Sequence, residues 1–262
     1  MDKILVSWRR ENNIAFVTID NPPVNALSSS VFEQLLKAIK ELENDNTIKI
    51  VVFTSENKKF FSAGADITEF PQWAQKGRSF VEEKSLELNK VFYKISSMNK
   101  PTIAVLNGVT LGGGCELALS CDFRIMEEQA VIGLPEVKLG LFPGAGGTQR
   151  LPRIVGEARA KEIIFTGKKL SAKEAHNIGL VNEVVMEGRS LEAAEELAQG
   201  IAKLSLPALQ LIKSTIQDGM ETTLIKGLEI EASNFGKVFE TEDVQEGLSA
   251  FLEKRPANFK DR

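Results

Sequence analysis

A run of three glycines, Gly112–Gly114, precedes the carboxylate of Glu116. A β-rich run, Thr102–Leu106, leads through Asn107-Gly108 to these glycines, and residues 114–120 are expected to form a helix. Glycines at a strand-to-helix junction permit unusual φ and ψ angles and let a ligand approach the backbone closely. The free N–H groups that open a helix suit developing negative charge. The stretch therefore combines an anion-binding backbone with a carboxylate.

A second carboxylate, Glu136, lies in residues 130–148, an irregular, glycine-rich and largely apolar stretch. Most loops are polar, so an apolar loop of this length predicts the lining of a pocket. Desolvation there would raise the pKa of Glu136 and make it a proton donor near neutrality. Each glutamate also has an ordinary explanation. Glu136 could face solvent, and an acidic residue in a first helical turn, such as Glu116, stabilises the helix dipole by about 0.3–1 kcal/mol.

A second small-residue turn, Ala63-Gly64-Ala65, follows a predicted buried strand. Two backbone N–H groups from different loops could form an oxyanion hole, with the two carboxylates on opposite sides of the bound group. This arrangement suits a thioester whose carbonyl oxygen gains charge as an enolate forms, and each donor contributes about 2.7–4 kcal/mol in the transition state. Such chemistry requires no metal and no organic cofactor.

The composition describes an ordinary globular protein of 262 residues with 43% hydrophobic and 26% charged residues. Its net charge of −4 offers no general attraction for nucleic acid or an anionic membrane. The first residues resemble neither a signal peptide nor a transit peptide, and no apolar run reaches membrane-spanning length. Cys115 and Cys121 have neither disulfide nor CxxC spacing, and His176 is the only histidine. We expect reduced thiols, no multi-histidine metal site and a cytoplasmic location.

The elements that must position these residues follow from periodicity. Residues 4–7 and 14–19 predict a hairpin, 31–42 an amphipathic helix that Ser28–Ser30 caps, and 48–54 a strand buried on both faces. Strand, turn and helix then occur twice with small residues at the turn. No GxGxxG fingerprint is present, so this pattern favours an α/β fold of stacked β–β–α units over a Rossmann fold. From Gly156 onward the periodicity is helical, with a capping box at Ser171–Glu174.

The chain resembles the crotonase superfamily and, within it, enoyl-CoA hydratase. The resemblance covers essentially the whole chain, through the segments 61–67, 107–117, 134–136, 139–151, 165–167, 175–181 and 251–256. It implies a crotonase-like spiral of β–β–α units over residues 1–195 and a C-terminal helical trimerisation region over 196–262. The implied assembly is a homohexamer, a dimer of trimers.

The resemblance also assigns roles to single residues. The N–H groups of Ala65 and Gly113 match the oxyanion hole that holds the thioester oxygen. Glu116 would activate the water that attacks Cβ, and Glu136 would deliver the proton to Cα. Five further residues match the segments that line the coenzyme A site in this superfamily: Val24, Ala26, Ala63, Asp66 and Ile67.

Two positions depart from the pattern. Leu134 stands where mitochondrial hydratases often have glutamine, so a hydrogen bond from that side chain is missing. Thr68 stands where a lysine that contacts coenzyme A can occur. The phosphates would then rely on Lys58, Lys59 or Lys260.

These features predict a hydro-lyase that adds water reversibly, in syn geometry, to a trans-2-enoyl-CoA in fatty-acid β-oxidation or a related acyl-CoA pathway. Its partner is an acyl-CoA thioester. The alternatives are the same chemistry on another acyl group, such as a branched or 3-hydroxybutyryl-CoA, and a Δ3-Δ2-enoyl-CoA isomerase. One branch of this superfamily also binds AU-rich RNA, and basic residues recur between Arg78 and Lys100. Acidic residues interleave with them, so a solvated mixed-charge helix is the favoured interpretation, with no nucleic acid and no membrane as partner.

Overall fold

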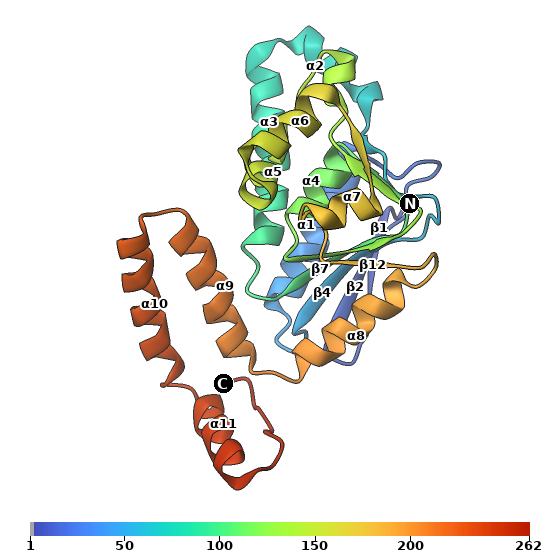
Figure 1. Ribbon diagram of the computed structural model, residues 1–262. Coiled ribbons are helices and arrows are strands. Elements are labelled where there is room, and N and C mark those ends of the chain that lie inside the picture. The colour runs from blue at the N-terminus through green and yellow to red at the C-terminus, as the bar shows by residue number, and fades with distance from the viewer. Residues whose placement is uncertain (1–2) are drawn as a thin grey trace.

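The computed structural model describes residues 3–262 and is built on a six-stranded sheet in the order β1-β2-β4-β7-β9-β12 (Figure 1). β1 and β2 form an antiparallel hairpin, and the other neighbouring strands run parallel. The strands are β1 (Val6–Glu11), β2 (Ile14–Ile19), β4 (Ile50–Ser55), β7 (Thr102–Leu106), β9 (Phe123–Glu127) and β12 (Glu183–Val185). The predicted hairpin is confirmed, although its first strand begins two residues later than expected and continues to Glu11.

A second sheet of four strands follows the order β11-β10-β8-β5, and β3 pairs with β6 in a third. These strands are β3 (Ala26–Leu27), β5 (Phe60–Ser62), β6 (Gly64–Ala65), β8 (Val109–Leu111), β10 (Val131–Gly133) and β11 (Lys169–Ser171). The strands β4, β7 and β9 of the first sheet are each followed in the chain by a strand of the second, namely β5, β8 and β10. The predicted stacking of β–β–α units is therefore confirmed.

Helices cover both faces of the six-stranded sheet. Along β2, Ala15 and Val17 contribute to the larger core, whereas Ile14 and Phe16 pack toward α8 (Ser190–Ala202) on the other face (Figure 1). The larger core also contains α1 (Ser29–Asn44), which the Ser28 side chain caps, and α4 (Gly113–Leu119). The remaining helices of the body are η1 (Ile67–Glu69), α2 (Phe70–Lys76), α3 (Arg78–Ser96), η2 (Glu136–Leu139), α5 (Gly147–Val155), α6 (Glu157–Thr166) and α7 (Ala172–Asn177).

Three helices, α9 (Leu206–Met220), α10 (Leu224–Val238) and α11 (Glu242–Glu253), form an arm that extends from the body (Figure 1). Ion pairs of 2.7 Å between Lys213 and Asp122 and of 2.6 Å between Lys49 and Asp261 tie its base to the sheet. The boundary that we expected between residues 195 and 196 lies inside α8. Ala194 before this point and Ala198 after it both pack on the sheet. No helix within residues 3–262 is long and apolar enough to cross a membrane.

Candidate active site

Two backbone segments from different loops meet at the start of α4. A Cβ atom added to Gly113 would lie 3.3 Å from the backbone nitrogen of Ala65, and one added to Gly64 would lie 3.4 Å from the nitrogen of Gly113. Gly64 has a φ of +111°, a region that side chains disfavour, so both its conformation and its space require glycine. The backbones of Ala65 and Gly113 therefore lie next to each other, and the role of their N–H groups as an oxyanion hole stays a prediction.

Glu116 lies on α4 and is 3% exposed. Its Oε1 accepts hydrogen bonds of 2.8 Å from the backbone N–H groups of Ala145 and Gly147. Burial raises the pKa of Glu116 above its usual value, and these two N–H groups and the Arg150 guanidinium act in the opposite direction. The side chain is therefore held in one orientation by donors that stabilise its ionised form.

Glu136 begins the short helix η2, close to the glycines that precede α4. Its Oε1 would lie 3.2 Å from a Cβ atom on Gly112. Its Oε2 is buried and has no hydrogen-bond partner among the described residues. Burial, together with the negative charge of Glu116, raises the pKa of Glu136 to about 7. A carboxyl group of this pKa can exchange a proton with a substrate near neutral pH.

The surroundings of Glu136 differ in part from the prediction. Ile132 and Leu134 are fully buried, but the side chains of Val137, Leu139, Leu141 and Phe142 are 40–72% exposed. The prediction that residues 130–148 are irregular is therefore wrong for β10, η2 and the start of α5, and their role as a pocket lining stays a prediction. Residues 131–133 form β10 and Gly147 begins α5. Between them Leu134 and Ala145 are buried, whereas the apolar side chains within residues 137–142 lie on the surface of the chain.

The five positions that match the coenzyme A site lie on two adjacent segments. The parallel pairing of β3 with β6 sets Ala26 opposite Gly64, and the N–H of Ala63 donates to the carbonyl of Val24. Asp66 caps η1 by accepting from the N–H and the hydroxyl of Thr68, and Ile67 is 54% exposed. The structure thus brings all five together beside the Ala65 backbone.

The basic residues considered for the phosphates are not gathered in one place of the chain. Lys58 and Lys59 are exposed in the loop between β4 and β5, whereas Lys260 is exposed near the C-terminus. Their role toward coenzyme A stays a prediction.

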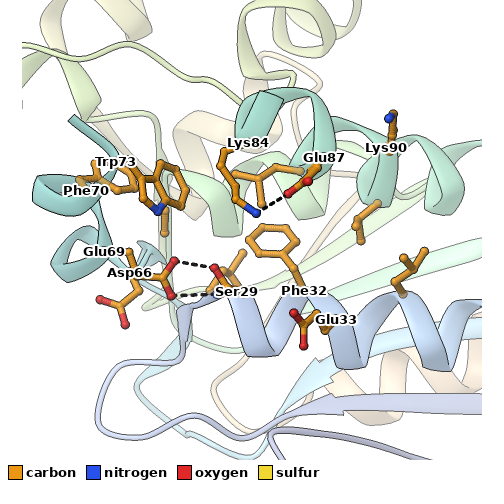
Figure 2. Close-up of a pocket in the computed structure, with 15 residues that line it drawn as sticks. Ser29, Phe32, Glu33, Asp66, Glu69, Phe70, Trp73, Lys84, Glu87 and Lys90 are labelled. Carbon is orange, nitrogen blue, oxygen red and sulfur yellow. Dashed lines mark hydrogen bonds and ion pairs between the residues drawn. The ribbon is translucent and has the colours of Figure 1, made fainter. Parts of the chain in front are cut away.

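A pocket of about 370 Å³ adjoins Ala65 (Figure 2). Its apolar wall comes mainly from Phe32 of α1, from Phe70 and Trp73 of α2, whose rings stack, and from Leu88 of α3. Charged side chains also line it, including an ion pair of 2.6 Å between Lys84 and Glu87. The sequence does not predict this pocket, because its walls come from three separate helices. Neither Glu116 nor Glu136 lines it, and Ala65 connects it to the site.

The charges of α3 do not form a continuous basic surface. Lys84 pairs with Glu87, and Lys94 with Glu43 of α1. Lys100, which counted toward the basic recurrence in the sequence, is 3% exposed and donates to the carbonyls of Leu42 and Asp45 at the end of α1. The prediction that Lys100 contributes to a basic surface is therefore wrong. The absence of a nucleic-acid partner stays a prediction.

The two thiols are free, as we expected, and both are buried. Burial raises the pKa of Cys121 to about 12 and that of Cys115 well above its usual value, so both are poor nucleophiles near neutral pH. His176 is exposed on α7.

The residues that hold Glu116 were also missed by the sequence analysis. Ala145 and Gly147 donate to it, and a Cβ atom on Gly147 would lie 3.1 Å from its Oε1. The available signal was the glycine-rich run 144–147 directly before a helical pattern, since such a turn presents free N–H groups.

Known proteins are similar to this chain over nearly its whole length. A short-chain-enoyl-CoA hydratase from Clostridium acetobutylicum is 43% identical over 260 residues, 98% of each chain. A crotonyl-CoA hydratase from Syntrophomonas wolfei is 41% identical over 95% of each chain. The crystal structure of an enoyl-CoA hydratase from Bacillus anthracis superposes with a TM-score of 0.93 at 36% identity, over 98% of this chain and 100% of that one. The profile of the family described as enoyl-CoA hydratase/isomerase matches residues 9–262. The chain therefore belongs to the enoyl-CoA hydratase/isomerase family, the crotonase superfamily that its motifs resemble, and has the crotonase-like α/β fold.

Proposed function

We propose that this protein catalyses the reversible syn addition of water to a trans-2-enoyl-CoA, which gives a 3-hydroxyacyl-CoA. The observation that carries the proposal is the position of two glutamates beside the meeting point of the 64–65 and 112–113 backbones. One is buried and oriented by two N–H groups, and the other has a pKa of about 7. This is the combination that a hydro-lyase acting on a thioester requires.

The N–H groups of Ala65 and Gly113 donate to the thioester oxygen in this scheme. As water adds at Cβ, negative charge moves onto that oxygen, and the two donors stabilise the enolate. Each donor of this kind contributes about 2.7–4 kcal/mol in the transition state. Neither a metal nor an organic cofactor enters the scheme, and coenzyme A is part of the substrate.

Glu116 orients the attacking water and takes its proton. Because Oε1 already accepts from Ala145 and Gly147, we assign the contact with water to Oε2. Glu136 delivers the proton to Cα. With a pKa of about 7, it is protonated in a large fraction of molecules at neutral pH and can be reprotonated after each turnover. A positioned acid or base contributes typically ~10²–10⁴ in rate.

The pocket between α1, α2 and α3 (Figure 2) receives the acyl chain in this proposal, since Ala65 is among the residues that line it. Val24, Ala26, Ala63, Asp66 and Ile67 contact coenzyme A on the other side of Ala65. The names of the relatives from Clostridium acetobutylicum and Syntrophomonas wolfei support a short acyl chain, with crotonyl-CoA as the first substrate to test.

The test is the addition of crotonyl-CoA, followed by the loss of the conjugated thioester absorbance. We expect turnover by the natural sequence and a decrease of ~10²–10⁴ in kcat for Glu116→Gln and for Glu136→Gln, with binding of the CoA ester retained. Full activity in either variant would contradict its role. Product formation only from a branched enoyl-CoA would indicate a different acyl group. Conversion of a 3-enoyl-CoA without hydration would indicate an isomerase.

We further propose that the arm forms the trimer contacts of a homohexamer. Its helices expose large apolar side chains that a single chain leaves uncovered, among them Ile216, Met220, Leu224, Ile225, Phe251 and Leu252, each 61–81% exposed. Burial of such side chains between copies would stabilise an assembly. Light scattering during size-exclusion chromatography tests the six-fold mass.

We also propose a cytoplasmic location and a place in β-oxidation or a related acyl-CoA pathway. Cell fractionation tests the location, and growth on fatty acids tests the pathway.

A further inference from the structure

The helix α3 has one face on the acyl pocket and another on the turn that holds Glu116. Lys84, Glu87 and Leu88 line the pocket (Figure 2). Ser85 and Asn89 lie one helical turn apart and point instead to the carbonyl of Gly144. The hydroxyl of Ser85 donates to this oxygen at 2.6 Å, and Nδ2 of Asn89 donates to it at 3.0 Å.

The Gly144 carbonyl and the Ala145 N–H belong to the same peptide group. This group is planar, so the direction of its oxygen fixes the direction of its hydrogen. The oxygen accepts from Ser85 and Asn89, while the N–H donates to Oε1 of Glu116 at 2.8 Å. One rigid unit therefore connects two side chains of α3 to the carboxylate of α4.

Further contacts place Asn89 against the same turn. Gly146 has a φ of +106°, and a Cβ atom added to it would lie 3.2 Å from Oδ1 of Asn89. The next N–H of the turn that bonds Glu116 belongs to Gly147. On its other side the turn is held by Arg150, which donates to the carbonyl of Ala145 at 3.2 Å.

We propose that Ser85 and Asn89 are positioning residues for Glu116, which they orient through the Gly144–Ala145 peptide. The inference rests on the proposed role of Glu116 as the base. Neither residue lines the acyl pocket, so their effect falls on the chemical step and not on the binding of the thioester.

Loss of both donors would let the peptide rotate and weaken the hydrogen bond from Ala145 to Glu116. The ionised carboxylate would lose part of its stabilisation, so the pKa of Glu116 would rise further and the acidic limb of the rate profile would move to higher pH. The other charged or titratable groups around Glu116 are Arg150, Glu136 and the thiol of Cys115, and all three stay unchanged.

The experiment compares Ser85→Ala, Asn89→Ala and the double variant, with crotonyl-CoA as substrate. The matched controls are Ser96→Ala, which removes a hydroxyl of α3 that bonds only the Tyr93 carbonyl, and Asn44→Ala, which removes an amide that bonds the Lys40 carbonyl. We expect the double variant to lose about tenfold or more in kcat with KM within about twofold, and its acidic limb in kcat/KM to move to higher pH. Ser85→Thr keeps the hydroxyl. When it is combined with Asn89→Ala, the pH profile of kcat/KM should therefore lie closer to that of the natural sequence than the profile of the Ser85→Ala, Asn89→Ala double variant does.

An unchanged kcat and pH profile in the double variant would overturn the proposal. So would a loss of kcat without movement of the acidic limb, or an equal loss in the two controls, since either result indicates a general structural effect. Ser85 and Asn89 are partly exposed, and the single variants give the same comparison if the double variant does not fold. Glu116→Gln distinguishes failure of the proposed function from failure of the positioning role. Retained activity in Glu116→Gln would contradict the proposed function. An inactive Glu116→Gln together with unchanged kinetics in the Ser85→Ala, Asn89→Ala double variant would contradict only the positioning role.

Discussion

Replacement of Glu136 by glutamine should reduce activity and at the same time remove a pH-dependent loss of stability. The folded-state pKa of about 7 lies above the ordinary 4.5, and burial is the main cause. Because the pKa of this carboxyl is higher in the folded than in the unfolded protein, the group stabilises the folded state at pH values below its unfolded pKa. This stabilisation is lost as the pH rises through the folded pKa. Burial disfavours the ionised form, and Oε2 has no hydrogen-bond partner within residues 3–262 that would offset this effect.

The size of the effect follows from these two pKa values. Between about pH 5.5 and about pH 8 the natural sequence should lose about 2 kcal/mol of unfolding free energy through this group. The carboxyl is partly exposed, and solvent screening reduces the expected loss to roughly 1–2 kcal/mol. Glutamine does not titrate, so any constant penalty from its buried amide cancels when the two pH values are compared.

The assay is urea unfolding of the natural sequence and of Glu136→Gln at both pH values, with the protomer concentration held constant. The difference in unfolding free energy between the two proteins should shift in favour of the variant by roughly 1–2 kcal/mol at the higher pH. In the same preparations kcat for hydration should be lower by ~10²–10⁴ in the variant. A stability difference that is the same at both pH values would show that Glu136 titrates normally and would refute the reasoning.

Three further variants test other parts of the site and the assembly. Gly113→Ala introduces a Cβ atom 3.3 Å from the Ala65 nitrogen, beside the expected place of the thioester oxygen, so kcat/KM should fall by about 10²–10³ while the thermal midpoint changes little. A normal kcat/KM would exclude this oxyanion hole. Trp73→Ala enlarges the pocket, so kcat/KM measured for a longer enoyl-CoA should rise relative to that for crotonyl-CoA; an unchanged ratio would place the acyl chain elsewhere. Phe251→Ser combined with Leu252→Ser should lower the mass measured by light scattering, and an intact oligomer would remove the arm from the assembly contacts.

Local patterns in the sequence were sufficient to predict most elements. The strand at Thr102–Leu106 has the predicted bounds, and Ser28 and Ser171 cap helices as expected. These features depend on residues that are neighbours in the chain, through hydrophobic period, caps and turns. Glu116 and Glu136 became candidates because each lies next to an unusual glycine-rich or apolar stretch.

Contacts between distant segments could not be predicted in this way. The N–H groups that orient Glu116 are about thirty residues away from it, and the pocket beside Ala65 is closed by side chains from α1, α2 and α3. The side chains of Val137 and Leu139 are apolar yet exposed, because η2 lies on the surface of the chain. Lys100 is basic yet buried, because its ammonium group caps the end of α1. Periodicity reports which face of an element is apolar and not which partner covers it.

The most direct test is a crystal structure of the protein with butanoyl-CoA, a saturated thioester that cannot add water. We predict that its carbonyl oxygen lies about 2.7–3.1 Å from the backbone nitrogens of both Ala65 and Gly113, with Glu116 and Glu136 beside Cβ and Cα. A thioester oxygen that contacts neither nitrogen, or a bound acyl group remote from both carboxylates, would contradict the proposed site.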